Sequence, residues 1–236
     1  MRTVFLGSPS RFCARALWGC LDAGYEVCEF WYGHRTPRRD WRGDRQLGWF
    51  NPNWSVSAAL RRHKISQLPV PPLRTASELW RRAKDLGATL LVSAGFPYIA
   101  PAEFLQMFPG RAVNLHPALL PDYRGPKPIL GMLYRDDVDR CGGVTLHQMV
   151  PEIDAGPIIA QQRVPWNPQG FRHWEADLGR ATYALTRTAL PTYLHGQIDP
   201  QPQIARDDVY FRRLDPESLL INSQLTSLRE IGRAHV

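Results

Sequence analysis

The chain has 236 residues, of which 44% are hydrophobic, and a formal net charge of +7. This length and composition suit one globular domain with a sizeable core and exclude an intrinsically disordered chain. The longest apolar runs, such as Ala88–Val92, are far shorter than the ~20 residues that span a bilayer. The first residues lack the long apolar stretch of a signal peptide. We therefore expect a cytoplasmic protein with no membrane partner.

Short β-rich runs alternate with helical patterns along the chain. Strands are predicted at Thr3–Leu6, Glu26–Trp31, Thr89–Ser93, Arg111–Leu115, Gly143–Met149 and Ile158–Val164. Helices are predicted at Ser10–Ala23, from the capping box Thr75–Glu78 to Gly87, at Ala102–Phe108 and at Phe171–Leu190, with Pro191 interrupting the last. This alternation predicts an α/β fold with a mostly parallel twisted sheet and helices on both faces. Ligands of such sheets bind at the carboxyl ends of the strands.

Residues 33–54 break this alternation and are predicted to form a long loop. Much of the positive charge lies in His34–Arg45, and Trp41, Trp49 and Trp54 add aromatic surface. Such a segment suits a polyanion, namely a nucleic acid, a nucleotide-linked substrate or a polyglutamylated cofactor. A solvated loop without a partner is the alternative, and charge alone does not decide between them.

The cysteines are predicted to be buried free thiols. They form no C-x-x-C pair and no framework typical of a small disulfide-bonded domain. The four residues are Cys13, Cys20, Cys28 and Cys141.

Two polar side chains lie at the end of the predicted strand Arg111–Leu115. Asn114 and His116 are two residues apart, so both are expected to point to the same side of the sheet. A second strand leads into a loop that holds Asp154 beside Gly156. Taken alone, neither of these two short motifs predicts a catalytic site. An Asn-x-His motif is usually structural or incidental, and an Asp-x-Gly motif is usually a turn. The longer pattern around them carries the functional prediction.

The order N-x-H-P-x-L-L-P-x-Y-R-G over Asn114–Gly125, then G-V-T-x-H and D-x-G, closely resembles the folate-dependent formyltransferase family. These proteins are 10-formyltetrahydrofolate N-formyltransferases. The resemblance runs from Met1 to about Gly196, including the opening F-x-G-S-P, and implies a Rossmann-like formyltransferase domain over residues 1–196. The absence of G-x-G-x-x-G argues against a dehydrogenase.

The resemblance implies that Asn114, His116 and Asp154 are the catalytic residues. An amine would attack the formyl carbon, and Asn114 would donate a hydrogen bond to the oxyanion that forms. His116 would stabilise the same oxygen when protonated or relay the proton of the amine, while Asp154 would orient the imidazole and favour its protonated form. No step requires a metal.

The cofactor 10-formyltetrahydrofolate is expected to lie against two apolar loops. The resemblance places the pterin against the backbone of the loop Ser93–Ile99, and the proline-punctuated loop Val150–Gly156 suits the other wall of the pocket. The expected cofactor contacts are Gly95, Phe96, Pro97, Tyr98, Ile99, Val150 and Ile153.

Family members formylate methionyl-tRNA, glycinamide ribonucleotide, nucleotide-linked amino sugars or amino-acid and peptide amines, and relatives hydrolyse the folate. The tRNA enzymes resemble this chain in a basic segment near residues 33–45. They usually lack a histidine at the position of His147 and carry Ala-Ala-Pro in place of Pro126–Pro128. We therefore expect a small-molecule amine acceptor, such as a nucleotide-linked amino sugar, with methionyl-tRNA as the alternative.

Two further alternatives remain open at this point. His147 either lines the cleft or is a strand histidine whose hydrogen bonds are satisfied. The chain as a whole could be a non-catalytic nucleic-acid-binding module that uses its basic, tryptophan-rich segment. The intact catalytic pattern argues against the second reading.

Residues 197–230 are predicted to be a linker toward a missing or truncated C-terminal domain. Gln197–Gln203 is rich in proline and glutamine, and Val209–Glu217 resembles the segment that joins two domains in several family members. Residues 231–236 read Ile-Gly-Arg-Ala-His-Val, the translation of a common short-read sequencing adaptor. We expect this end to be a sequencing scar, with the natural protein continuing further.

Overall fold

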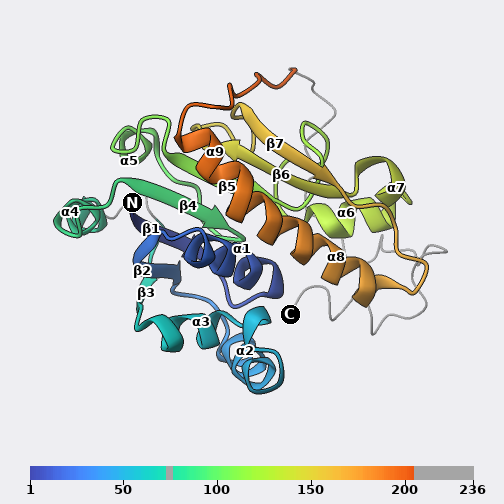
Figure 1. Cartoon of the computed structure of the whole chain (residues 1–236), viewed down its shortest axis with the longest axis horizontal. Helices are drawn as coiled ribbons and strands as arrows, with labels where there is room; N and C mark the ends of the chain where they lie inside the picture. The colour runs from blue at the N-terminus through green and yellow to red at the C-terminus, as the bar shows by residue number, and fades with distance from the viewer. Residues whose placement is uncertain (73–76, 205–236) are drawn as a thin grey trace.

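The computed structural model describes residues 1–72 and 77–204. Within them, the strands form one seven-stranded sheet in the order β3-β2-β1-β4-β5-β6-β7 (Figure 1). The strands are β1 (Arg2–Gly7), β2 (Glu26–Gly33), β3 (Ser66–Val70), β4 (Leu90–Ala94), β5 (Ala112–His116), β6 (Gly143–Gln148) and β7 (Ile158–Arg163). Neighbouring strands from β3 to β5 are parallel, whereas β6 and β7 pair antiparallel. The predicted mostly parallel sheet is confirmed.

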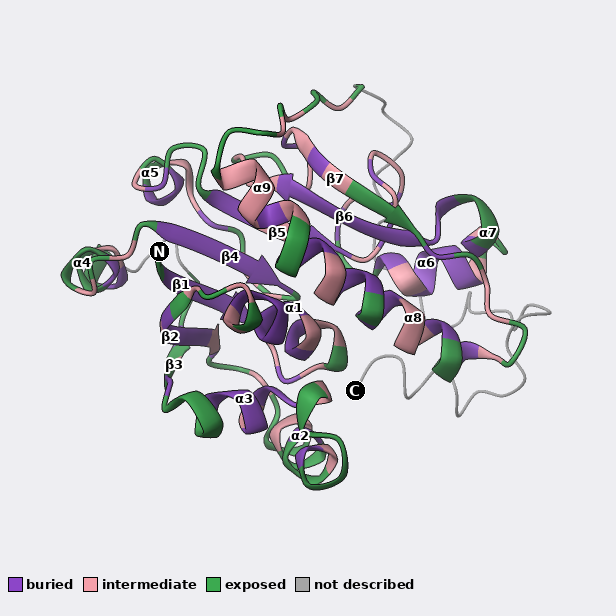
Figure 2. Ribbon diagram, in the orientation of Figure 1, coloured by how far each residue is buried: buried purple, intermediate pink, exposed green. Residues whose placement is uncertain are grey.

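Helices cover both faces of this sheet. They are α1 (Arg11–Asp22), α2 (Arg38–Phe50), α3 (Val56–His63), α4 (Ser77–Asp85), α5 (Ala102–Leu105), α6 (Pro128–Tyr134), α7 (Val138–Cys141), α8 (Phe171–Ala184) and α9 (Leu190–Leu194). Because strand side chains alternate, Phe5 packs with residues of α1 and α8, whereas Val4 and Leu6 pack with residues of α4 and α5. The buried strands between these two layers are purple in Figure 2.

The predicted loop over residues 33–54 is wrong. After β2 the chain forms α2, a short 3-10 helix at Pro52–Trp54, and then α3. The buried residues of α2 are Asp44 and Gly48, so the helix shows no apolar stripe that could reveal it in the sequence. Its contact with α3 is polar, because the Asp44 carboxylate accepts hydrogen bonds from the N-terminus of α3.

Pro191 does not interrupt the last long helix as predicted. After α8 the chain widens into a π-helical turn over Leu185–Ala189 and continues as α9. The Leu190 amide donates to the Leu185 carbonyl in this turn, and Pro191 falls in the first turn of α9. Proline is tolerated there because a first-turn residue needs no intrahelical N–H bond.

Other boundaries differ in smaller ways from the prediction. The helix predicted to Phe108 ends at Leu105, and the elements β3, α3, α6 and α7 were not predicted. Thr75 of the predicted capping box lies outside the described residues, as do residues 205–236, which include most of the predicted linker and the whole predicted scar. In the described part of the chain, no helix is long and apolar enough to cross a membrane.

All four cysteines are free, as predicted. Three are buried, whereas Cys28 is half-buried, so burial is confirmed for Cys13, Cys20 and Cys141. Burial raises the pKa of the Cys141 thiol to about 12, which keeps it protonated.

Candidate active site

The candidate site begins where β5 ends. Asn114 and His116 occupy alternate positions of this strand and face the same side of the sheet, as their spacing predicts. In the antiparallel pairing with β6, Asn114 lies opposite His147 and His116 lies opposite Thr145. The strand pairing therefore adds a second histidine beside the predicted pair.

Asp154 reaches the same point from the loop between β6 and β7. Its Oδ1 accepts a hydrogen bond from Asn114 Nδ2 at 3.4 Å, and its Oδ2 lies 3.5 Å from His116 Nδ1. The Gly125 backbone amide also donates to Oδ2, at 2.9 Å. Asp154 has a left-handed backbone with φ of 50°. The three side chains predicted to form the catalytic group thus lie together.

The hydrogen bonds of His116 define which of its nitrogens carries a proton. Nε2 lies 2.9 Å from the Tyr123 carbonyl oxygen, which can only accept, so Nε2 is the donor. In the neutral ring Nδ1 then has no hydrogen, and only the protonated ring can donate toward Asp154. Protonation of His116 would therefore form an ion pair with Asp154.

His147 is buried and neutral. Its Nδ1 donates to the Gln148 carbonyl at 2.8 Å, which leaves Nε2 to accept from Asn114 Nδ2 at 3.1 Å. Burial lowers the pKa of His147 to about 4, although the Asp154 carboxylate opposes this shift. The two readings left open by the sequence are therefore compatible, because His147 lines the cavity and has its hydrogen bonds satisfied.

A cavity of about 600 Å³ opens beside these side chains. Its walls come from the segment after β4, the end of β5, the turn around Lys127 and the loop after β6. Every residue predicted to contact the cofactor lines it, namely Gly95, Phe96, Pro97, Tyr98, Ile99, Val150 and Ile153. One wall is braced by the residue that follows β2, because the Tyr98 hydroxyl lies 3.0 Å from His34 Nδ1.

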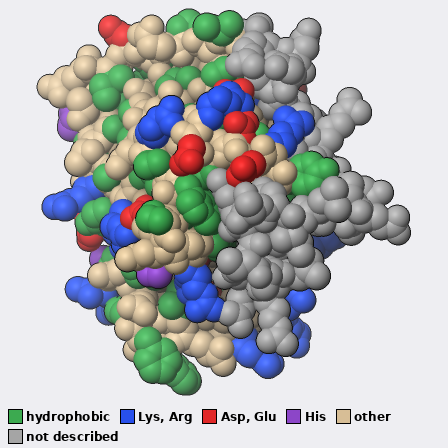
Figure 3. Space-filling model, turned by 90° about the vertical axis from the view of Figure 1, so that its right-hand side faces the viewer, with side chains coloured by type: hydrophobic (Ala, Val, Ile, Leu, Met, Phe, Trp, Pro, Cys, Tyr) green, Lys and Arg blue, Asp and Glu red, His purple; other side chains and the backbone are tan. Residues whose placement is uncertain are grey.

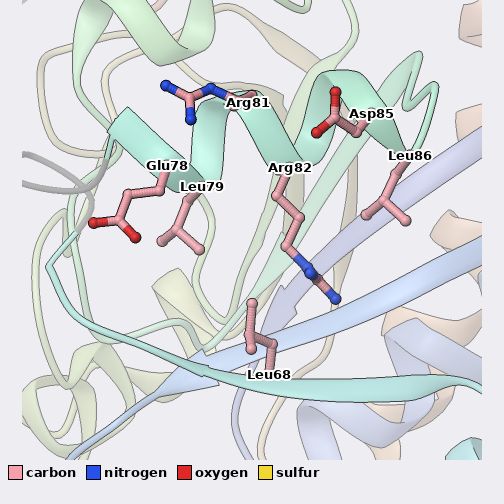
Figure 4. Close-up of a pocket in the computed structure, with 7 residues that line it drawn as sticks. All are labelled: Leu68, Glu78, Leu79, Arg81, Arg82, Asp85 and Leu86. Atoms are coloured by element: carbon pink, nitrogen blue, oxygen red, sulfur yellow. The ribbon is translucent and has the colours of Figure 1, made fainter.

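A second hollow lies between α4 and the edge strand β3 (Figure 4). It has a volume of about 510 Å³ and is lined by Leu68, Glu78, Leu79, Arg81, Arg82, Asp85 and Leu86. Arg82 is engaged there in an ion pair with the buried Glu29. This hollow contains none of the three predicted catalytic residues, so it is not the candidate site.

Two backbone groups of the site were not predicted from the sequence. The Tyr123 carbonyl and the Gly125 amide orient His116 and Asp154, and no residue type reveals a backbone contact in advance. Neither Tyr123 nor Arg124 donates a side-chain hydrogen bond to the trio, because the Tyr123 hydroxyl donates to Asp137 and Arg124 donates to Gln203. Across residues 1–72 and 77–204, no group of three or more His, Cys, Asp or Glu residues could hold a metal ion.

The profile of the formyl transferase family matches residues 65–172. The chain is 29% identical to a methionyl-tRNA formyltransferase of Levilactobacillus brevis, covering 99% of the chain and 74% of that protein. It is 34% identical to a methionyl-tRNA formyltransferase of Chloroflexus aurantiacus, covering 86% of the chain and 62% of that protein. The chain therefore spans under two thirds of the second relative.

A solved structure has a similar fold. It is the formyltransferase PseJ from Anoxybacillus kamchatkensis, in complex with UDP-4,6-dideoxy-4-formamido-L-AltNAc and tetrahydrofolate. The TM-score is 0.59 at 21% sequence identity, and the alignment covers 99% of this chain and 100% of PseJ. At this identity the likeness concerns the fold alone.

Proposed function

We propose that the chain is a member of the formyl transferase family, whose profile matches residues 65–172, and that it moves the formyl group of 10-formyltetrahydrofolate to a primary amine. The observation that carries this proposal is the meeting of Asn114, His116 and Asp154 beside one cavity. A carboxamide donor and a protonated imidazole can stabilise an oxyanion, and a carboxylate in contact with the imidazole can orient it.

The folate would occupy the cavity between the two predicted loops. Gly95–Ile99 and Val150–Ile153 offer apolar side chains and backbone groups to a flat ring, and PseJ carries tetrahydrofolate on a similar fold. The cavity volume of about 600 Å³ is in the range of small-molecule sites.

The reaction needs charge stabilisation more than a strong base. The amine nitrogen attacks the formyl carbon, the carbonyl π electrons move to the oxygen, and collapse of the intermediate breaks the bond from carbon to N10 of the folate. The amine loses a proton, and N10 gains one. Asn114 Nδ2 would turn from Asp154 toward the oxyanion, a contact worth ~3 kcal/mol in comparable sites.

The contacts of His116 favour an electrostatic role over direct proton relay. Its Nε2 is held by the Tyr123 carbonyl and its Nδ1 faces Asp154, so neither nitrogen is free toward the cavity. A protonated ring in this position would place positive charge near the oxyanion while Asp154 keeps the ring oriented.

The primary candidate acceptor is a small-molecule amine, such as a nucleotide-linked amino sugar. The residue types at two places in the cavity wall favour it, because His147 and Pro126–Pro128 differ from the residues of the usual tRNA enzymes. Lys127 is exposed at the cavity mouth, where a cation could meet a phosphate of such an acceptor.

Methionyl-tRNA is the second candidate, and two observations favour it. The two sequence relatives described above are methionyl-tRNA formyltransferases. Helix α2 also exposes four arginines, and it begins a few residues after His34, which contacts Tyr98 at the cavity. These arginines are Arg38, Arg39, Arg42 and Arg45. By contrast, the described part of the face in Figure 3 mixes Lys and Arg with Asp and Glu.

The test supplies 10-formyltetrahydrofolate labelled with 13C in the formyl group, together with either a nucleotide-linked amino sugar or methionyl-tRNA. We expect label in the acceptor and an equal amount of tetrahydrofolate. Binding of RNA without transfer to either acceptor would instead support the non-catalytic module. A variant carrying both Arg42→Glu and Arg45→Glu should lower transfer to methionyl-tRNA and spare a small acceptor.

A further inference from the structure

The side chain of Gln203, which follows the predicted domain 1–196, contacts two parts of the candidate site. These parts are the loop that holds Asp154 and the rim residue Arg124. Gln203 lies in the segment after α9, which passes beside β7 (Figure 1). Two residues earlier, Gln201 exchanges both backbone hydrogen bonds with Ile158 at the start of β7, each at 2.8 Å. The segment is therefore fixed to the sheet immediately before it reaches the site.

The Gln203 carboxamide uses both its donor and its acceptor ends. Nε2 donates to the Asp154 carbonyl at 2.9 Å and to the Gly156 carbonyl at 2.7 Å. Oε1 accepts from Arg124 Nε at 3.0 Å and from Nη2 at 2.6 Å. One amide thus joins the loop of Asp154 to the rim residue Arg124.

The contacts of Gln203 with the Asp154 loop and with Arg124 both affect the position of the Asp154 carboxylate. A left-handed backbone is unfavourable for a residue other than glycine, so the bond to the Asp154 carbonyl helps to hold the φ of 50° that aims its side chain at His116. Arg124 is close enough to Asp154 for their charges to interact. In the part of the chain that the structure describes, Arg124 nevertheless forms no ion pair, because its guanidinium points to Gln203.

We propose that Gln203 is a positioning residue for the reaction. It holds Asp154 toward His116 and the Gly125 amide, and it keeps Arg124 from pairing with the Asp154 carboxylate in place of His116. This inference rests on the proposed function, because only formyl transfer gives the orientation of Asp154 its importance. It assigns residues 197–204 to the framework of the active site rather than to a linker.

The first test reads the position of Asp154 without any catalysis. The Gly125 amide donates to Asp154 Oδ2, so its hydrogen exchange, followed by NMR in the full chain, reports that contact. In Gln203→Ala this amide should exchange about tenfold faster than in the wild type. Gln203→Glu keeps the acceptor for Arg124 but loses both N–H donors, so it should also exchange faster. The matched control Gln201→Ala retains its backbone bonds and should behave as the wild type.

The second test separates positioning from general stability. In Gln203→Ala, kcat for formyl transfer should fall by about tenfold, whereas KM for the folate should change less. A variant that melts at a lower temperature but keeps wild-type exchange at Gly125 and wild-type kcat would overturn the inference. If the wild type itself transfers no formyl group, the proposed function fails, and the exchange measurement still decides whether Gln203 positions Asp154.

Discussion

His147 is buried and uncharged, and its imidazole contacts the side chain of Asn114. Its Nε2 accepts from Asn114 only while the ring is neutral, and burial maintains that state by lowering its pKa to about 4 from the usual 6.5. The histidine therefore fixes which way the Asn114 carboxamide faces. We expect this to prepare Asn114 as a hydrogen-bond donor.

The depressed pKa of His147 predicts how stability changes with pH. Between pH 6.5 and about 4, the unfolded chain binds a proton at His147 that the folded chain does not. Acidification therefore favours unfolding, and the contribution of this residue falls by about 2 kcal/mol between pH 7 and pH 5. The measurement is the free energy of unfolding in urea, at pH 7 and at pH 5, for the wild type and for His147→Gln. The wild type should lose more stability between the two pH values than the variant, and this difference is the contribution of His147. Equal pH dependence of the two proteins would contradict the buried neutral state.

Removal of Asn114 should weaken the chemical step. We expect Asn114→Ala to lower single-turnover transfer by about 100-fold, since one donor to an oxyanion typically contributes ~3 kcal/mol. More activity should remain than in His116→Ala, because water can partly replace a neutral donor. Asn167→Ala, outside the cavity, is the control. A change in folate affinity without a change in rate would show that Asn114 binds the cofactor instead.

At the scale of elements, α2 and α3 are joined by hydrogen bonds to a buried carboxylate. The buried Asp44 accepts from the Val56 amide at 2.8 Å, the Ser57 amide at 2.7 Å and the Ser55 hydroxyl at 3.1 Å. It thereby satisfies donors at the N-terminus of α3 and complements the positive end of that helix.

We therefore predict that Asp44→Ala destabilises the protein by about 2 kcal/mol, since it leaves buried donors without an acceptor. Arg45→Ala changes an exposed side chain of the same helix and should have a small effect. Thermal unfolding of both variants measures the difference. If the two variants unfolded alike, Asp44 would not join α2 to α3.

Two of the elements that the sequence missed, α2 and β3, lack a periodic apolar pattern. Helix α2 buries Asp44 and Gly48, and β3 is a mostly exposed edge strand that contains Pro69, a residue typical of edges and not of central strands. The central strands were predicted because they are short, apolar and bounded by turns. The π turn before Pro191 could not be predicted, because it depends on how the helix packs against the sheet.

At the scale of the whole molecule, the site combines residues from distant parts of the chain. Asn114 and His116 could be paired from their spacing alone, and the family pattern added Asp154. Their shared partners are backbone groups and Gln203, which depend on folding and carry no signature in the sequence. The proposed type of reaction could therefore be inferred from the sequence, whereas the hydrogen bonds around the candidate residues could not.

At this scale, His116 is proposed to act on charge that develops during formyl transfer. The most direct measurement compares the wild type, His116→Ala and the exposed control His173→Ala in two assays. One is single-turnover transfer from 10-formyltetrahydrofolate to the competent acceptor, and the other is calorimetric binding of 5-formyltetrahydrofolate. We predict that His116→Ala lowers transfer by more than about 100-fold and leaves folate affinity within about threefold, because only the transition state is affected. Near-native transfer by His116→Ala would contradict a catalytic role of His116.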